Sequence, residues 1–292
     1  MARPGPLSSV KSPNHYSLPP PLPTILRRLK PLFFRRSPKI YQPFSPNLLI
    51  ASSFMADSNS RASVLADSAE NGPKYAEIIV IRHGETEWNA DRRIQGHLDV
   101  DLNDAGRQQA VAVADRLSRE PNISAVYSSD LKRASETAET IAKGCGILEV
   151  TKDPAFRERH LGYLQGAVLH EAAKVNPDAY QAFLSNRDDQ EIPGGGESFN
   201  QLYQRSTSAL QKIAKKHIGE RIVVVSHGGT IRALHKRASP HRRCAAKVLN
   251  TSVNVFHLSD EGKWSIKSWG DVSHLNQTEF LESGFGGDRN SG

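Results

Sequence analysis

The sequence predicts an α/β fold, namely a three-layer α/β/α sandwich with a mostly parallel sheet and an antiparallel edge strand. Three observations predict it. Short aliphatic runs alternate with longer segments of helical periodicity from Lys74 onward, which is typical of strands and helices that alternate along a chain. Two of the aliphatic runs have fully apolar cores, as expected of strands covered on both faces of a sheet. The last two candidate strands are joined by a short polar turn, which indicates a hairpin.

The first half of the predicted domain contains three strands and two helices. The run 77–81 ends at Arg82 and has the composition of a buried parallel strand. Residues 104–120 carry apolar side chains at helical spacing behind Asn103 and Asp104, which are suited to cap a helix. The remaining elements expected in this half are a strand at 124–128, a helix at 130–143 and a strand at 147–150.

The second half begins with helical patterns and ends with the hairpin. Helical stretches are expected at 169–185 and 197–217. The run 221–225 is apolar and leads into Ser226-His227-Gly228-Gly229, after which a helix extends to about Lys236. Segments 252–258 and 264–268 alternate between apolar and polar residues like the two strands of an antiparallel hairpin.

The composition excludes several classes of protein. With 38% hydrophobic and 24% charged residues among 292, the chain can form a packed core. Its two cysteines, Cys145 and Cys244, are too few for a disulfide framework or a thiolate zinc cluster, which favours a reducing compartment. No uninterrupted apolar run reaches the roughly 18 residues that a membrane-spanning helix needs. We therefore expect no membrane partner and no cysteine-based metal site.

The net charge of +7 originates in the N-terminal segment. Residues 1–54 contain eight of the 38 basic side chains and no acidic one, which leaves 30 basic residues against 31 acidic ones in the rest of the chain. The body of the protein is therefore close to neutral, and we expect no nucleic-acid partner for it. Only the N-terminal segment leaves the binding of a polyanion open.

Residues 1–54 also have the composition of a targeting sequence. They hold 11 of the 17 prolines and are rich in Ser, and an acid-free leader without a long apolar core is typical of an organelle transit peptide. We expect import into a plastid (chloroplast) or a mitochondrion; a disordered tail or an untranslated stretch is the alternative, and translation from Met55 would give a cytosolic form. Residues 55–73 are interpreted as a linker, 74–277 as the folded domain and 278–292 as a flexible tail.

Two predicted strands are followed by a His-Gly pair, His83-Gly84 and His227-Gly228. Because open α/β sheets bind ligands beyond the carboxyl ends of their strands, we expect the two imidazoles to meet in one crevice. An imidazole can act there as a nucleophile, a base or a metal ligand, and Arg82 offers donors that match phosphate oxygens. Two alternatives are an ordinary turn at each pair and a metal site of two His and one Glu, although no His-x-x-x-His spacing supports the metal site.

The string Arg82-His83-Gly84-Glu85-Thr86-Glu87-Trp88-Asn89 resembles the signature of the histidine phosphatase superfamily. The branch that it resembles contains the cofactor-dependent phosphoglycerate mutases, their phosphatase relatives and the phosphoglycerate mutase-like proteins of plants. Further segments match in order between about Lys74 and Val255: Gln95-Gly96, Asp101-Leu102-Asn103, Gly106 with Gln109-Ala110, Ser128 to Ala134, Arg157 to Gly162, Gln165-Gly166, Gly195 to Ser198, and Ser226 to Gly229. The resemblance implies a histidine phosphatase domain at 74–277.

The resemblance also implies a role for each matching residue. His83 would be the phosphorylated nucleophile, and Arg82 and Arg133 would clamp the phosphate. His227 would donate to the phosphate and its transition state, and Glu158 would be the general acid. The substrate pocket would be formed by Arg82, Thr86, Asn89, Gln95, Gly96, Arg133 and Gly228, with Glu85 and His160 as supporting residues.

Simpler interpretations of some of these residues stay open. Glu158 lies between Arg157 and Arg159, so it could belong to a solvated cluster of charges. Arg133, with Lys132 and Glu136 nearby on a predicted helix, could form a surface ion pair. The basic stretch 235–243 could be a solvated helix end or the rim of a site for an anionic substrate.

One segment length distinguishes a phosphatase from a mutase. The resemblance implies that true mutases carry a long insertion over the site, whereas only 30 residues separate Gly166 from Glu197 here. A more open site admits water, which hydrolyses phosphohistidine. The sequence therefore predicts a metal-independent phosphomonoesterase that acts on a small phosphorylated metabolite without a cofactor. The alternative is a phosphoglycerate mutase-type isomerase, and a homodimer is left open.

Overall fold

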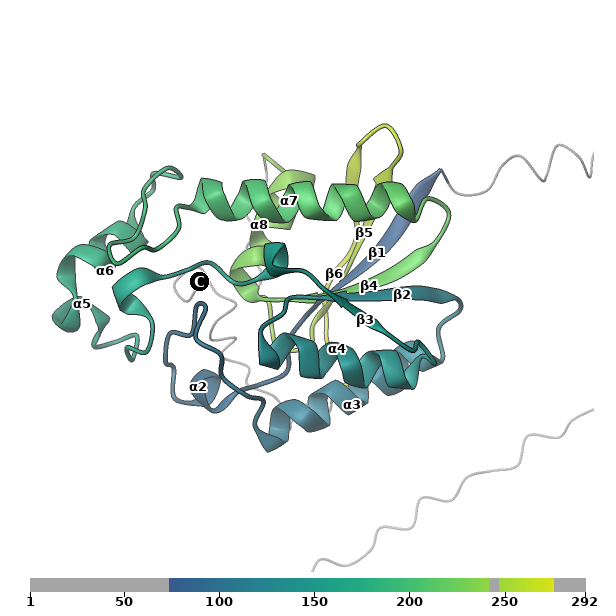
Figure 1. The fold of residues 1–292 in the computed structure, drawn as a ribbon, viewed down its shortest axis with the longest axis horizontal. Coiled ribbons are helices and arrows are strands. Elements are labelled where there is room, and N and C mark those ends of the chain that lie inside the picture. The colour runs from purple at the N-terminus through teal and green to yellow at the C-terminus, as the bar shows by residue number, and fades with distance from the viewer. Residues whose placement is uncertain (1–73, 242–246, 276–292) are drawn as a thin grey trace, which may run out of the picture. The chain divides into compact units, whose positions relative to one another are not determined.

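The computed structural model describes residues 74–241 and 247–275, and these form a single six-stranded sheet flanked by helices (Figure 1). The strands lie in the order β3-β2-β4-β1-β5-β6. Their bounds are β1 Tyr75–Arg82, β2 Ile123–Ser128, β3 Val150–Lys152, β4 Arg221–Ser226, β5 Val253–Ser259 and β6 Trp264–Asp271. The pairs β1–β4, β2–β4 and β2–β3 are parallel, and the pairs β1–β5 and β5–β6 are antiparallel. The predicted parallel sheet with an antiparallel hairpin at one edge is confirmed.

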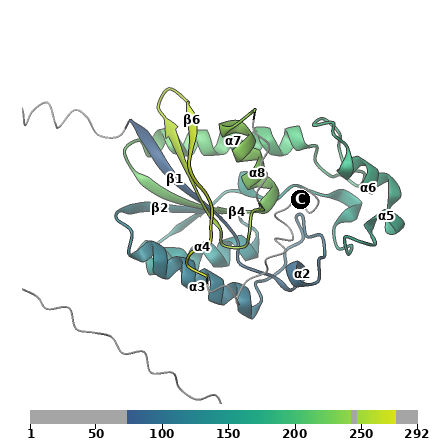
Figure 2. The same cartoon turned by 180° about the vertical axis from the view of Figure 1, so that it is seen from behind.

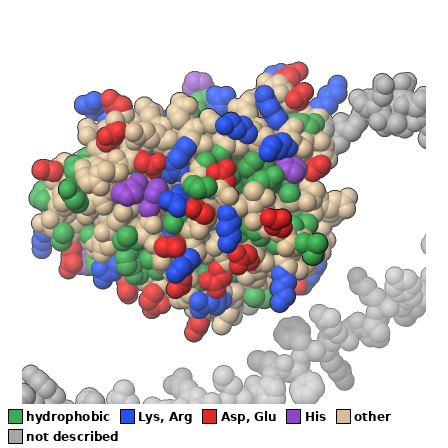
Figure 3. Space-filling view, in the orientation of Figure 1, with side chains coloured by type: hydrophobic (Ala, Val, Ile, Leu, Met, Phe, Trp, Pro, Cys, Tyr) green, Lys and Arg blue, Asp and Glu red, His purple; other side chains and the backbone are tan. Residues whose placement is uncertain are grey.

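Helices cover both faces of the sheet, which confirms the three predicted layers (Figures 1 and 2). One face carries α3 (Asp104–Ser118) and α4 (Lys132–Gly144), and the other carries α7 (Phe199–Lys216) and α8 (Gly228–Ala238). None of the helices in the described part of the chain is long and apolar enough to cross a membrane. Figure 3 shows basic and acidic side chains interspersed over the visible face of the domain, in keeping with the near-neutral charge of this part of the sequence.

Strand β4 buries side chains on both faces of the sheet, which explains the uninterrupted apolar run in its sequence. Ile222 and Val224 are fully buried in the core beneath α7 and α8, whereas Val223 and Val225 are fully buried in the core beneath α3 and α4. Successive side chains of a strand point to opposite faces, so a strand with a helix layer on each side needs apolar residues at every position.

A smaller helical lobe is formed by residues around 161–192, which lie between β3 and β4 in the sequence. It contains the short helices α5 (Ala172–Val175) and α6 (Pro177–Leu184), which pack with a separate apolar cluster that includes Ile94, Leu164 and Ile192. The prediction of one helix over 169–185 is therefore wrong. Pro177 lacks an N–H group and restricts the residue before it to extended backbone, so the helix must restart after Asn176, which caps α6.

Other local features also differ from the sequence prediction. The strand expected at 147–150 begins only at Val150, because Gly146 adopts a left-handed conformation (φ +72°) and the N–H of Ile147 donates to Ala142, which completes the end of α4. Helix α4 begins at Lys132, two residues later than predicted. The single turn α2 (Glu87–Ala90) was not predicted, since four residues carry no periodic signal.

The remaining sequence predictions concern residues outside the described ranges. They are the transit peptide at 1–54, the linker at 55–73, the flexible tail at 278–292, and Cys244.

Candidate active site

The two His-Gly pairs meet where β1 and β4 end side by side. The parallel register places Arg82 opposite Ser226, so the next residue on each strand is a histidine. The N–H of His83 donates to the carbonyl of Ser226 at 2.9 Å, and the ring centroids of His83 and His227 lie 5.1 Å apart. The prediction that the two imidazoles would meet at the carboxyl ends of neighbouring strands is confirmed.

His83 is held in one tautomer. Its Nδ1 lies 2.6 Å from the carbonyl oxygen of Gly84, so Nδ1 carries the proton and Nε2 keeps its lone pair. The side chain is almost fully buried. Desolvation, followed by the charges of Arg133 and Arg82, lowers the pKa of His83 well below its usual value. The ring is therefore neutral at neutral pH, as a nitrogen nucleophile must be.

His227 lies beside His83 with both ring nitrogens available. It is completely buried, and neither nitrogen has a hydrogen-bond partner among the described residues. Desolvation and then the positive charge of Arg133 lower its pKa well below the usual value. Buried polar groups in native proteins are almost always hydrogen-bonded, so this imidazole points to a ligand that accepts from it or donates to it.

Two buried guanidinium groups supply the positive charge of the site. Arg82 donates to the carbonyl of Val248 at 2.8 Å. Arg133 is 1% exposed and donates to the carbonyls of Gly96 and Leu98. Burial lowers the pKa of Arg133 to about 10, so it remains charged at neutral pH. The alternative of a surface ion pair for Arg133 is wrong, and an anion would offset the cost of burying these charges.

Glu158 is also inside the site, so the alternative of a solvated charge cluster is wrong. The residue is 5% exposed, and its carboxylate accepts from two backbone groups, the N–H of Arg159 at 2.8 Å and the N–H of Gly229 at 3.0 Å. Gly229 lies two residues after His227, in the first turn of α8. The neighbour Arg157 turns away to pair with Asp130 at 2.6 Å.

The remaining predicted pocket residues shape the loop around His83. Thr86 caps α2, and its backbone N–H and hydroxyl both donate to the amide oxygen of Asn89, at 3.1 and 3.0 Å. Gly96 adopts a left-handed conformation (φ +54°), and its carbonyl accepts from Arg133. Gln95 is buried, and its side-chain oxygen has no partner among the described residues. Gly228 is the first residue of α8.

Of the two supporting residues, Glu85 accepts from Asn103 at 2.9 Å at the start of α3, and His160 donates its N–H to the carboxylate of Glu197. No group of three or more His, Cys, Asp or Glu side chains within residues 74–241 and 247–275 has the arrangement of a metal site.

The sequence analysis missed two residues that contact the backbone of Arg82 and His83 although they lie about 170 positions further along the chain. The side-chain amide of Asn250 donates to the carbonyl of His83 at 3.0 Å, and the N–H of Thr251 donates to the carbonyl of Arg82 at 3.0 Å. Thr251 adopts a left-handed conformation (φ +54°), which is uncommon for a β-branched residue. An Asn-Thr pair before a strand gives no functional signal by itself, and only the fold brings it against β1.

The fold and this site together define a phosphate-binding α/β enzyme with histidine at its centre. The family model of the histidine phosphatase superfamily (branch 1) matches residues 78–272, and the chain belongs to this superfamily. It is an enzyme, a phosphatase that acts through phosphohistidine.

Individual relatives cover most of the same region. The chain is 67% identical over 218 residues to phosphoglycerate mutase-like protein 4 of Arabidopsis thaliana, covering 75% of this chain and 95% of that protein. It is 56% identical over 215 residues to a metal-independent phosphoserine phosphatase of the same plant, covering 74% and 90%. Among solved structures, the phosphoserine phosphatase of Entamoeba histolytica in complex with 3-phosphoglyceric acid superposes with a TM-score of 0.59 at 30% identity, covering 69% of this chain and 100% of that one.

The burial of two neutral histidines predicts a loss of stability in mild acid. Both side chains have folded-state pKa values well below 6.5, whereas the unfolded chain binds their protons near pH 6.5. The free energy of unfolding is therefore unaffected by these two groups above about pH 6.5. It falls as the pH drops below that value, by up to roughly 2.7 kcal/mol per pH unit for two protons.

Urea unfolding of the protein and of a His83→Gln/His227→Gln variant between pH 7.5 and 5.0 measures this slope. We expect the free energy of unfolding to fall more steeply for the unsubstituted protein. Equal slopes would mean that the folded protein also binds both protons.

Proposed function

We propose that the chain is a metal-independent phosphomonoesterase that hydrolyses a small phosphorylated metabolite of the phosphoserine type. The observation that carries the proposal is the pairing of neutral His83 and His227, whose rings lie 5.1 Å apart and feel the charges of the buried Arg82 and Arg133. Such a site offers a nucleophile and positive charge in place of a metal ion. The similarity to proteins named as phosphoserine phosphatases supports the substrate class.

In the first step, the phosphoryl group moves to His83. The Nε2 lone pair attacks phosphorus, the P–N bond forms, and the bond from phosphorus to the leaving oxygen breaks. Glu158, protonated for this step, gives its proton to that oxygen. Arg82, Arg133 and a ring N–H of His227 stabilise the charge on the other phosphate oxygens.

In the second step, water releases the phosphate. Glu158, now a carboxylate, removes a proton from a water molecule as the water oxygen bonds to phosphorus and the P–N bond breaks. Inorganic phosphate leaves, and both His83 and Glu158 return to their starting protonation states. A mutase would instead return the phosphoryl group to another hydroxyl, an alternative favoured by the name of one relative, phosphoglycerate mutase-like protein 4.

The proposed function leads to a prediction about His83 and metal ions. The purified domain should hydrolyse phosphoserine, EDTA should leave the rate unchanged, and His83→Ala should abolish it, because the proposed mechanism passes the phosphoryl group through Nε2 of His83. Release of inorganic phosphate is the measurement. Loss of activity in EDTA that magnesium or zinc restores would contradict the proposal. Interconversion of 2- and 3-phosphoglycerate on addition of bisphosphoglycerate, without phosphate release, would favour the mutase.

Another prediction concerns Glu158. An alkoxide leaves poorly without a proton, whereas p-nitrophenolate is a stabilised anion, and a positioned acid contributes roughly 100- to 10,000-fold. Glu158→Gln should therefore reduce kcat/KM severely for phosphoserine and only mildly for p-nitrophenyl phosphate. An equal loss for both substrates, or no loss for either, would argue against a general-acid role.

We further propose that residues 1–54 direct import into a plastid or mitochondrion. Their acid-free, Ser- and Pro-rich composition supports this. A fusion of residues 1–73 to a fluorescent protein should enter the organelle and be shortened, as judged by microscopy and immunoblotting. A diffuse cytosolic signal from the full-length fusion would refute the targeting proposal.

A further inference from the structure

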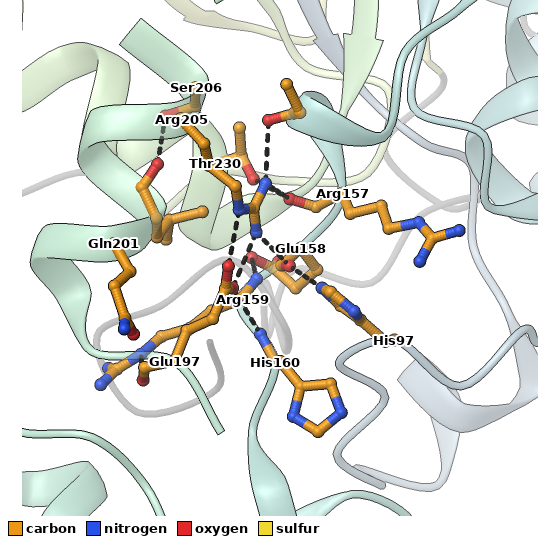
Figure 4. A network of polar contacts seen from close by, with 12 residues as sticks. His97, Arg157, Glu158, Arg159, His160, Glu197, Gln201, Arg205, Ser206 and Thr230 are labelled. Carbon is orange, nitrogen blue, oxygen red and sulfur yellow. Dashed lines mark hydrogen bonds and ion pairs between the residues drawn. The ribbon is translucent and has the colours of Figure 1, made fainter. Parts of the chain in front are cut away.

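We infer that Arg205, joined to Glu197, is a positioning residue that fixes the backbone beside Glu158 and thereby places the general acid. The inference rests on the proposed function and goes beyond it, since neither residue belongs to the proposed set of reacting groups. Figure 4 shows the arrangement: Arg205 extends from α7 into the loop that carries Glu158.

Every N–H donor of Arg205 has an acceptor. Nη1 donates to the carbonyls of Ala155 and Arg157, both at 2.8 Å, and Nη2 donates to the carbonyl of Glu158 at 2.7 Å. The carboxylate of Glu197 accepts the other two bonds, from Nε at 2.7 Å and from Nη2 at 2.8 Å. A guanidinium has five N–H donors in a fixed planar fork, so Arg205 holds three backbone carbonyls and one carboxylate at set angles.

These carbonyls have no partner in a helix or strand ladder. After the short turn Pro154–Phe156, the chain runs past Glu158 without regular structure until Gly162. Each carbonyl must therefore find a side-chain donor, since an unsatisfied buried backbone group is costly. Other side chains assist: Thr230 donates to the carbonyl of Arg157 at 2.8 Å, and His97 Nε2 lies 2.6 Å from the carbonyl of Glu158.

Glu197 fixes the other side of Glu158. One of its oxygens accepts from the N–H of His160 at 2.9 Å, and its own N–H donates to the carbonyl of His160 at 2.8 Å. The backbone around Glu158 is thus held on its N-terminal side by Arg205 and on its C-terminal side by Glu197. The two residues form an ion pair that is about 20% exposed on each side, which keeps the arrangement largely out of water.

Displacement of this segment would affect the proton donor before the nucleophile. His83 and its arginines are held by β1, β4 and α4, whereas Glu158 depends on the segment that Arg205 ties down. A misplacement of about 1 Å can cost roughly 100-fold in rate. A less firmly held segment should therefore slow proton transfer from Glu158 more than the attack by His83.

Arg205→Lys tests the inference because it keeps the positive charge and removes the planar set of guanidinium donors. A lysine has three donors around one point and cannot span three carbonyls and a carboxylate. The readout is kcat/KM for phosphoserine and for p-nitrophenyl phosphate, since kcat/KM includes the step that releases the leaving group. We expect a loss of about tenfold or more for phosphoserine and of no more than about twofold for p-nitrophenyl phosphate.

Arg221→Lys is the matched control. Arg221 pairs with Glu77 at 2.5 Å and Glu120 at 2.6 Å, is 23% exposed against 21% for Arg205, and lies at the start of β4, the end away from His227. We expect it to change the urea midpoint and leave the ratio of the two kcat/KM values unaltered. An equal loss on both substrates in Arg205→Lys, or no loss, would overturn the inference.

A double-substitution cycle separates action through Glu158 from general damage. In a Glu158→Gln background, Arg205→Lys should change the ratio of the two substrates no further, because the proton donor is already absent. A further change in that ratio would contradict the inference. If His83→Ala retained activity, the proposed function itself would be wrong. If Glu158→Gln lowered kcat/KM for phosphoserine more than for p-nitrophenyl phosphate but Arg205→Lys did not, the proposed function would stand and only the inference about Arg205 would be wrong.

Discussion

The parallel pairing of β1 with β4 is the contact on which the rest of the site depends. It sets Arg82 opposite Ser226 and so brings two histidines, 144 residues apart in the sequence, to one edge of the sheet. A shift of one residue in this register would move every side chain of one strand to the other face. The register is secured because both strands bury apolar residues on both faces beneath separate pairs of helices.

The cost of the site is electrostatic. Two arginines and two histidines are withdrawn from water, three of them at the ends of these strands and Arg133 in α4, and burial together with mutual repulsion keeps the histidines neutral. Without a bound anion, this group of donors lowers the stability of the folded state, because desolvated charges are unfavourable unless they are compensated. The same arrangement suits a phosphate, whose oxygens accept from guanidinium and imidazole groups at once. Stability and function therefore place opposite demands on this edge of the sheet.

Much of this organisation was predictable from the sequence. The strands, the long helices and the hairpin follow from periodicity, which depends on the face that each element buries. The meeting of His83 with His227 follows from the rule that parallel strands present their carboxyl ends together. Boundaries were less predictable: at Asn176-Pro177 and at Gly146, single residues with special backbone preferences overrode the apolar pattern.

The sequence by itself determined the elements and the order of the motifs, because these depend on local pattern. The roles of the candidate reacting side chains were implied by the family resemblance. Only the tertiary structure decided that Glu158 is buried against α8 and that Arg133 is an interior cation. It alone brought Asn250 and Arg205 to the backbone of His83 and Glu158. These hydrogen bonds join residues that are 47 and 167 positions apart, and the acceptors are backbone carbonyl oxygens. Because every residue has a carbonyl, the sequence leaves no mark of which ones a distant side chain will reach.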